Sequence, residues 1–575
     1  MPARREAGAL SDLLASAGVL LAAGASAASI LLPAGRLRSA AMLLAIALFP
    51  ILILGDQWHT QQILDLRHDT SRIVALLLIG LATVSALAYL FRRWPLLMPL
   101  AIIAALPFRI PLHAGGDTAN LLVPLYLVIA GGVLAVLLRD WAAPPAGGAV
   151  GGPAPEEALA TAGGGGSPAA TGPAGRAAQW LPRVLAAVVV LYAIQTLYSA
   201  DFSKGLQNVC FFLVPFTVAY GLLNDVRWDR KLLRWALVVV AAEAVAFVLI
   251  GSVEYVTRSL FWNDQVIRSN EFHTYFRVNS VFWDPNVYGR YLALVIVVAT
   301  AALLWVQERR AFASLAVLVA VLWVGLAQTF SQSSFIALLA GLAVLAALRW
   351  SWRWTLGVVA VGTVGAVLVV LFVGGSGKIR LNTDTSGRAN LVSGGLELFT
   401  ERPIQGYGSG SFQHAYRDHA ANKDVPVSIS HTEPVTVAAE QGLLGLVLYL
   451  ALIAVALWTM TAGLRGLMPG LPNAPPAGGA GGGPAPEDAS ATAGGGGSPA
   501  ATGPAGWAVG PSAGPAARAA VLAAFVALLV HTMAYAGFFQ DPITWVLMAI
   551  GASLAAGRIG APDRTAPTAT LADPA

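Results

Sequence analysis

The chain has 575 residues, of which 57% are hydrophobic and only 11% are charged, and its mean hydropathy is +0.68. A soluble protein carries about a quarter charged residues, so this composition excludes a soluble globular protein and indicates a polytopic membrane protein. The net charge of +5 gives little reason to propose a nucleic-acid partner, and the single Cys210 excludes an internal disulfide or a thiolate metal cluster.

Long apolar runs predict about 12 to 15 membrane-spanning segments. Each should be a helix, because a spanning segment must satisfy its own backbone hydrogen bonds in lipid, so the predicted fold class is an all-α polytopic membrane protein. The first run follows Arg4 and Arg5 but is long enough to stay in the membrane instead of being cleaved as a signal peptide. The runs lie at residues 13–33, 39–55, 73–91, 95–108 (a short one), 119–138, 180–199, 206–223, 232–251, 287–306, 313–330, 333–348, 354–374, 441–461, 518–537 and 541–557.

Lys and Arg residues gather in alternate connections between these runs, as expected for the cytoplasmic side. They are Arg36, Arg38, Arg92, Arg93, Arg139, Arg227, Arg230, Lys231, Arg234, Arg309, Arg310, Arg349 and Arg353. The odd-numbered connections are therefore predicted to be cytoplasmic, and the long connections 251–285 and 375–434 to face outward. The count puts the N-terminus outside, against which Arg4 and Arg5 argue, so a miscount of one early run stays open.

Two stretches rich in Gly, Ala and Pro interrupt the apolar pattern. They begin with nearly the same sequence, PPAGGAVGGPAPEE and PPAGGAGGGPAPED, and they bury too little apolar surface to offset their chain entropy. We expect disordered linkers there, with a partner tether as the alternative. The predicted organisation is N-terminal transmembrane helices (1–143), a linker (144–179), central transmembrane helices (180–374) with an outward loop (251–286), an extracytoplasmic catalytic loop (375–434), a transmembrane helix (435–465), a second linker (466–517), and C-terminal transmembrane helices with a tail (518–575).

The connection 375–434 concentrates polar side chains between apolar runs. An interfacial Arg more often anchors a helix than takes part in catalysis, whereas His431 could equally cap a helix end or act as a base, and these readings stay open here. His414 and His419 are five residues apart without an HExxH pattern, so they do not form a helical zinc site and are expected to be surface histidines. The candidates in this connection are Arg388, Arg402 and His431.

A second polar cluster begins at Arg277 and continues into the turn signal WDPN, which places Asn286 near a helix start. The run Gly406, Gly408 and Gly410 permits a tight backbone path. It lacks the Lys-Ser/Thr ending of a P-loop, so ATP binding is not supported.

Taken in chain order, these residues resemble the O-antigen ligase and polymerase superfamily of bacterial membrane glycan transferases. The matching stretches are LPFRIPLHAGGDTANLLVPLYLVIAGG (106–132), RVNSVFWDPNVYGRYL (277–292), SGRANLVSGGLELFTERPIQGYGSGSF (386–412), HTEPVTVAAEQGLLGLVLYL (431–450) and HTMAYAGFFQDPITWVLMAI (531–550). The resemblance implies a GT-C-like bundle in the cytoplasmic membrane with its active site on the extracytoplasmic face. It also implies transfer of a glycan from an undecaprenyl-pyrophosphate carrier to a hydroxyl of a glycolipid, glycan or protein, without a cofactor or metal.

The resemblance implies catalytic roles for His431, Arg277 and Arg388. A neutral His can accept the proton of the attacking hydroxyl near pH 7, and guanidinium groups can neutralise the departing pyrophosphate. Direct displacement would invert the anomeric centre. One departure from the pattern is Ser331-Gln332, where many relatives carry Ser-Arg, and another is Thr432, where Asn or Ser often follows the His.

Further substrate contacts are expected from Glu433, Asn286, Arg402 and Arg109, and Asp541 is a further candidate for the polar cavity. Glu440 lies inside an apolar run, where a carboxylate is a functional candidate by default. Ligase and polymerase cannot be separated on this sequence. A transporter or flippase for polyprenyl-linked glycans and a structural scaffold are the alternatives of other classes.

Overall fold

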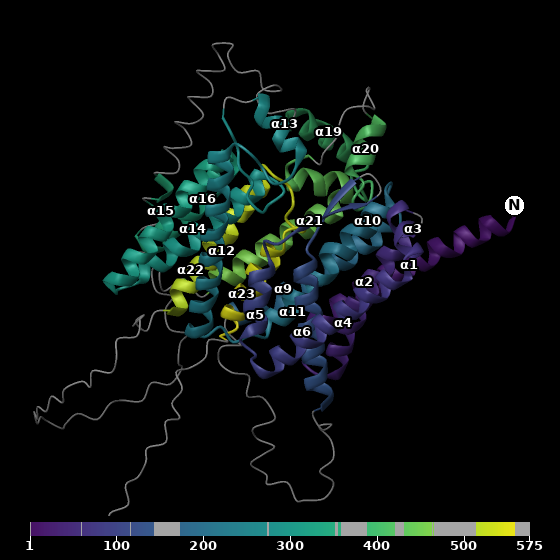
Figure 1. The fold of residues 1–575 in the computed structure, drawn as a ribbon, viewed down its shortest axis with the longest axis horizontal. Coiled ribbons are helices and arrows are strands. Elements are labelled where there is room, and N and C mark those ends of the chain that lie inside the picture. The colour runs from purple at the N-terminus through teal and green to yellow at the C-terminus, as the bar shows by residue number, and fades with distance from the viewer. Residues whose placement is uncertain are drawn as a thin grey trace, which may run out of the picture.

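The computed structural model describes residues 2–58, 60–114, 117–142, 173–272, 275–350, 353, 355–357, 388–419, 430–462, 464 and 513–557. Within these ranges the chain is an assembly of helices with one two-stranded antiparallel hairpin (Figure 1). Twelve of the described helices are long and apolar enough to cross a membrane. The predicted class, an all-α polytopic membrane protein, is confirmed.

The elements follow in chain order. The N-terminal third contains α1 (Pro2–Leu31), α2 (Arg36–Asp56), α3 (Gln61–His68), α4 (Thr70–Arg93), α5 (Leu97–Ala105), β1 (Ile110–Ala114), β2 (Asp117–Leu121) and α6 (Val123–Ala142). The central part contains α9 (Pro173–Thr196), α10 (Phe202–Asn208), the π-helical turn η1 (Val209–Leu213), α11 (Val214–Asn224), α12 (Arg230–Thr257), α13 (Asp264–Phe272), α14 (Pro285–Trp305), α15 (Arg309–Thr329) and α16 (Gln332–Arg349). The C-terminal part contains α19 (Arg388–Glu401), α20 (Phe412–His419), α21 (Glu433–Thr461), α22 (Ala513–Thr532) and α23 (Pro542–Ala555).

Local sequence explains where many of these helices begin. An Asp precedes several of them and accepts a backbone N–H of the first turn, which satisfies a donor that has no partner within the helix. A proline occupies the first turn of α14, α21 and α23, where its missing N–H costs nothing. The capping residues are Asp69, Asp201, Asp229, Asp284 and Asp541.

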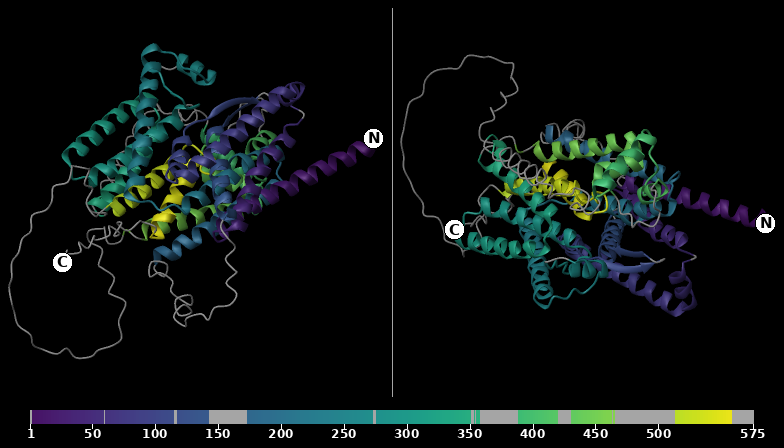
Figure 2. Two further views of the ribbon diagram at one scale, coloured as in Figure 1. Left: turned by 60° about the horizontal axis from the view of Figure 1, so that its bottom comes forward. Right: turned by 90° about the horizontal axis from the view of Figure 1, so that it is seen from above.

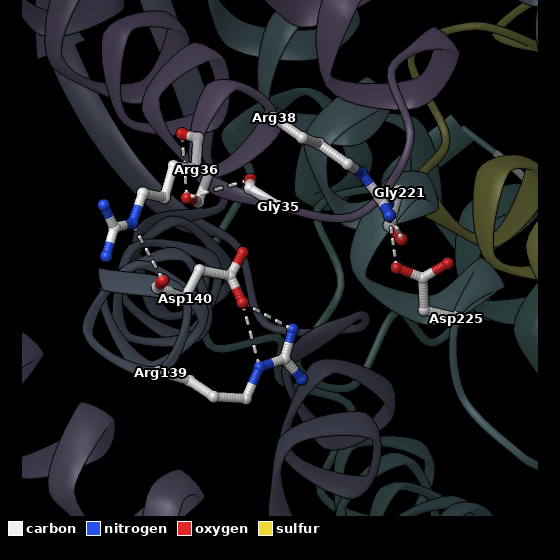
Figure 3. Close-up of polar contacts among 8 residues, drawn as sticks. Gly35, Arg36, Arg38, Arg139, Asp140, Gly221 and Asp225 are labelled. Carbon is white, nitrogen blue, oxygen red and sulfur yellow. Dashed lines mark hydrogen bonds and ion pairs between the residues drawn. The ribbon is translucent and has the colours of Figure 1, made fainter. Parts of the chain in front are cut away.

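Arginines join the helix ends at one end of the bundle (Figure 3). Arg36 at the start of α2 donates through Nε to the carbonyl of Asp140 near the end of α6, at 3.4 Å. Arg38 pairs with Asp225 after α11 and donates through Nη2 to the carbonyl of Gly221, at 2.9 Å. We call this the basic end of the bundle, because it gathers the starts and ends of spans that carry Arg.

The opposite end carries the shorter elements. Asp56 at the end of α2 accepts a hydrogen bond from the hydroxyl of Ser203 in α10, at 2.8 Å, so α2 runs antiparallel to the α10–η1–α11 segment. In Figure 1, α13, α19 and α20 all lie above the long helices, and in Figure 2 the start of α1 projects away from the bundle. We call this opposite end the site end.

Burial separates central from peripheral spans. The span 202–224 has 78% of its most apolar window buried and the span of α14 has 67%, whereas that of α4 has only 6%. A peripheral span can leave its apolar side chains exposed because lipid is as apolar as a protein core. The helices α11 and α14 therefore form the centre of the assembly, and α4 lies at its edge.

Several predicted boundaries are wrong. The run 95–108 was predicted as a span but forms the nine-residue α5, which is too short to cross and leads into the β1–β2 hairpin. The run 541–557 forms α23, whose 14 residues are also fewer than a normal span needs. The predicted span 354–374 lies almost entirely outside the described residues.

The predicted linkers are also too long at their C-terminal ends. Residues 173–179 belong to α9, which starts at Pro173, and residues 513–517 belong to α22. Both starts are rich in alanine, and α9 has proline at its first position, which are favourable features for a helix start. The rest of both linkers lies outside the described residues.

Candidate active site

His431 lies directly before α21 at the site end, in an unusual backbone conformation. Its φ is +62°, in the left-handed region that a residue with a Cβ rarely adopts. The Ser430 hydroxyl donates to the carbonyl of Thr432 at 2.8 Å and lies 2.7 Å from the hydroxyl of Thr436. These contacts fix the turn that presents the half-buried imidazole at the start of the helix.

Two residues that follow His431 join α21 to the segment between α22 and α23. The Thr432 hydroxyl donates to the carbonyl of Met533 at 3.1 Å. The buried Glu433 carboxylate accepts the backbone N–H of Gly537 at 2.6 Å and of Phe538 at 3.1 Å. Glu433 therefore has a structural role, because it holds the segment before α23 against α21. That it also contacts substrate stays a prediction.

The aromatic ring of Tyr535 lies near two imidazoles. Its centroid is 6.2 Å from that of His431 and 5.9 Å from that of His531, the buried histidine at the end of α22. His531 Nε2 lies 3.2 Å from the hydroxyl of Ser333 and 3.4 Å from that of Ser334, both in the first turn of α16. Sequence reasoning missed His531 as a site residue, although an ionisable side chain inside an apolar run is the signal that marks such positions.

A network of neutral polar groups continues from α16 to Arg277. Ser331 donates to Asn286 Oδ1 at 2.9 Å and lies 2.8 Å from the hydroxyl of Ser334. Arg277 Nη2 donates to the same Asn286 oxygen at 3.0 Å, and Arg277 Nε donates to the carbonyl of Thr329 at 3.0 Å. Asn286 therefore orients the Arg277 guanidinium. The sequence placed Asn286 near a helix start but did not reveal this role.

Polar and ring contacts thus connect Arg277 with His431 through α14, α16 and α22. Both residues lie at the site end, although a long stretch of chain and several spans separate them in sequence. That Arg277 and His431 act together in one catalytic site stays a prediction.

Arg388 is the first residue of α19, and its side chain lies outside the described part of the chain. The helix itself packs on the first turn of α21, because a Cβ added at Gly395 would lie 2.6 Å from the Val435 side chain. At a rise of about 1.5 Å per residue, the backbone of Arg388 is roughly 10 Å along α19 from this contact. The start of α19 therefore lies at the same end of the bundle as His431.

Arg402 belongs to a different cluster, at the end of α19. Its guanidinium lies 4.3 Å from the ring centroid of Tyr407, and His419 Nε2 lies 2.9 Å from Glu401 Oε2. Burial and the Glu401 carboxylate, which accepts the Tyr407 hydroxyl, raise the pKa of Tyr407 to about 12. Stacking on an aromatic ring is a frequent structural use of Arg, so a substrate contact by Arg402 stays a prediction. His414 is about half exposed, in keeping with the surface position expected for it.

The glycine-rich segment after Arg402 fills a break in α21. Gly442 has non-helical backbone angles (φ 64°, ψ −162°), which interrupt the helical hydrogen bonds around it. The displaced carbonyl of Glu440 accepts the N–H of Gly408 at 2.7 Å, and the N–H of Leu443 donates to the carbonyl of Pro403 at 2.7 Å. The glycine-rich segment therefore supplies hydrogen-bond partners to the backbone groups that the break in α21 leaves without helical partners. Irregular backbone within a membrane protein needs such partners from neighbouring segments.

A buried ion pair ties α14 to the start of α23. Arg290 Nη2 lies 2.8 Å from Asp541 Oδ2, and both side chains are about 5% exposed. Arg109, between α5 and β1, is close enough to interact electrostatically with both, and burial lowers the pKa of its guanidinium. The structure thus places two predicted residues, Arg109 and Asp541, beside Arg290, which sequence reasoning overlooked although it lies inside an apolar run.

The described part of the chain has no group of three or more His, Cys, Asp or Glu side chains placed to hold a metal ion. The arrangement at the site end combines the half-buried His431 imidazole, the Arg277 guanidinium with its bonds to Thr329 and Asn286, and the buried Arg290–Asp541 ion pair. Such a site can accept a proton and stabilise negative charge on a departing group.

The chain was compared with protein families and with curated proteins, and one family matches part of it. None of the curated proteins compared with the chain matches it. The family described as O-antigen ligase matches residues 319–450, which extend from α15 through α16, α19 and α20 into α21. This match includes Ser331, Arg388 and His431 and supports a membrane glycan ligase or polymerase type of function. Over residues 319–450, which include α16 and parts of two further membrane-spanning helices, the chain is therefore similar to the O-antigen ligase family.

Proposed function

We propose that the protein transfers a glycan from an undecaprenyl-pyrophosphate carrier to an acceptor hydroxyl, with inversion at the anomeric carbon. The observation that carries this proposal is the series of contacts that connects Arg277 with His431 at the site end of the bundle. The family match supports the same class of reaction.

In the proposed reaction, the acceptor oxygen attacks the anomeric carbon and a new glycosidic C–O bond forms. The bond between that carbon and the pyrophosphate oxygen breaks, and undecaprenyl pyrophosphate leaves with the bonding electrons. His431 accepts the hydroxyl proton as general base, a contribution typically worth about 10² to 10⁴ in rate. Arg277, together with Arg388, neutralises the charge that develops on the pyrophosphate, for which a guanidinium is suited because it can donate paired hydrogen bonds.

The geometry around Arg277 supports its assignment. Its Nε and Nη2 donate to oxygens of Thr329 and Asn286, so these two contacts hold the guanidinium in one orientation. Preorganised charge of this kind stabilises a transition state without reorganisation during the reaction. Arg388 is assigned from the position of its backbone at the start of α19.

The location that we propose for the site is the extracytoplasmic face of the cytoplasmic membrane. The basic end holds Arg36, Arg38 and Arg139, and Lys and Arg near spans favour the cytoplasmic side. The site end is opposite to it, so His431 and Arg277 would face outward.

A transporter or flippase remains the alternative of another class, and α21 offers a specific observation on which to weigh it. Discontinuous helices are typical of transporters. Here the backbone groups freed by the break at Gly442 form hydrogen bonds with Pro403 and Gly408. These bonds hold the two halves of α21 in place instead of leaving them free to move apart. That favours an enzyme.

The experiment that tests the proposal is transfer by the full-length protein in proteoliposomes. A labelled undecaprenyl-pyrophosphate-linked repeat unit is supplied with and without an envelope extract as acceptor source. A ladder of product lengths would identify a polymerase, and one shifted band on an acceptor would identify a ligase. Movement of the intact lipid-linked glycan across the bilayer without any glycosidic product would refute glycan transfer and favour a flippase.

A further inference from the structure

A cavity of about 70 Å³ lies beside the first two turns of α21, on the side of the α10–η1 segment. By the usual measure this volume holds roughly five water molecules, which suits the hydroxyl-bearing edge of one sugar ring and is too small for a polyprenyl chain. Its charged and amide lining side chains come from four segments of the chain. They are Lys204, Asn208, Gln413, Glu433, Glu440 and Gln540.

Irregular backbone surrounds this cavity on three sides. Asn208, the last residue of α10, and Phe212 of the π-helical turn η1 line it, and π-helical turns inside α-helices occur frequently at functional sites. Gly410 lines it at the end of the segment that fills the break in α21, and Gly537 lines it between α22 and α23. Non-helical backbone in a membrane protein is tolerated where it is buried or lines a polar cavity, so this convergence indicates a built site.

The carboxylates of the cavity are held in place by backbone donors. Glu440 Oε2 accepts the N–H of Gly410 at 2.9 Å, and Glu440 Oε1 accepts the N–H of Phe412 at 3.2 Å. Glu433 is fixed in the same way by Gly537. Each carboxylate oxygen can accept more than one hydrogen bond, so both groups can still receive hydroxyl donors from a ligand.

The rest of the lining complements these acceptors. Asn208, Gln413 and Gln540 carry amides that both donate and accept hydrogen bonds, and Lys204 adds a cation. The aromatic rings of Tyr192, Phe212 and Phe539 complete the wall. Oriented acceptors, amides and ring faces together suit a polyhydroxylated ligand, whereas a pyrophosphate would meet two carboxylates.

We infer that this cavity binds a sugar ring of the acceptor, and that it is a separate subsite from the one that holds the carrier pyrophosphate. The inference rests on the proposed function. Thr436 lines the cavity and its hydroxyl lies 2.7 Å from that of Ser430, the residue before His431. The cavity wall is therefore in contact with the turn that carries His431, the proposed general base.

Thiol labelling of the full-length protein tests occupancy without requiring turnover. The only native cysteine, Cys210, is fully buried, so labelling by a hydrophilic maleimide should report an introduced cysteine. Gln413→Cys places a thiol on the cavity wall, and His414→Cys places one on the neighbouring exposed position as the matched control. The probes are oligosaccharides released by mild acid from the envelope glycan of the source cells, and undecaprenyl pyrophosphate.

We expect the oligosaccharides to slow labelling of Gln413→Cys in a saturable manner and to leave His414→Cys unaffected. Lys204→Cys, at the exposed edge of the cavity, repeats the measurement if Gln413→Cys does not elute as a folded protein. Absence of protection by the oligosaccharides, or protection by undecaprenyl pyrophosphate instead, would overturn the assignment. Protection without any transfer in the proteoliposome assay would leave the subsite standing and count against the proposed function alone.

Discussion

The carboxylate of Glu433 accepts the backbone N–H of Gly537 at 2.6 Å, and this bond joins the first turn of α21 to the segment that leads into α23. The bond forms only two residues after His431, whose backbone adopts a positive φ. The position of the proposed general base therefore depends on a segment that lies far along the chain.

Glu433→Ala should lower both stability and transfer. It leaves the N–H groups of Gly537 and Phe538 without their acceptor, and an unsatisfied buried donor costs about 1–3 kcal/mol. Glu433→Gln retains one acceptor oxygen and should recover part of the loss. The measurements are the thermal midpoint of the purified protein and the transfer rate, and equal behaviour of Ala and Gln variants would contradict the prediction.

His431→Ala and Arg277→Ala should each abolish most glycan transfer while the protein remains in the membrane at normal abundance. For His431 the loss should be about 10²- to 10⁴-fold, the usual contribution of a general base. The matched control is His414→Ala on the exposed face of α20, which should retain activity. Full transfer by His431→Ala at equal expression would remove this residue from the mechanism.

Tyr535→Ala should reduce transfer, because its ring packs near the imidazoles of both His431 and His531. Tyr535→Phe keeps that ring and should retain most of the activity. The comparison is made on the maximal rate at saturating donor, together with its pH dependence. A Tyr535→Ala variant that matches the wild-type rate and pH profile would show that the ring does not position His431.

Gly442→Ala and Gly406→Ala should destabilise the protein. Both positions have positive φ, and an added Cβ would lie 2.3 Å from the backbone oxygens of Ile404 and Glu440, respectively. Gly80→Ala is the matched control, since a Cβ there meets nothing within 4 Å and alanine favours a helix by about 0.5–1 kcal/mol. Thermal unfolding in detergent compares the midpoints of the three variants. An unchanged midpoint for Gly442→Ala would contradict the close backbone contact between the glycine-rich segment and the break in α21.

Replacing one partner of the buried Arg290–Asp541 ion pair should destabilise the protein more than replacing both partners. Asp541→Leu leaves Arg290 charged and buried, which typically costs about 3–5 kcal/mol. The double variant Arg290→Met with Asp541→Leu should recover much of that loss, because it replaces the pair with apolar side chains. A double-mutant cycle of unfolding midpoints measures the coupling, and strictly additive losses would refute an interaction between these two residues.

Most of the membrane architecture could be predicted from the sequence, because apolar runs of sufficient length must form helices in lipid. The prediction failed at 95–108, which is already short for a span, and at 541–557; in both places the helix is shorter than the apolar run. Length and hydropathy do not reveal where backbone contacts to other segments end a helix.

The sequence by itself determined the membrane class, the family resemblance, and the choice of Arg277 and His431 as candidates. It could not reveal that Asn286 orients Arg277, that His531 and Tyr535 lie beside the site, or that the glycine-rich segment fills the break in α21. These relationships join residues from α14, α16, α22 and the loop before α21, so only the packing of those helices decides them. The physical reason is that hydropathy fixes each span separately, whereas hydrogen-bond partners between spans depend on how the helices pack together.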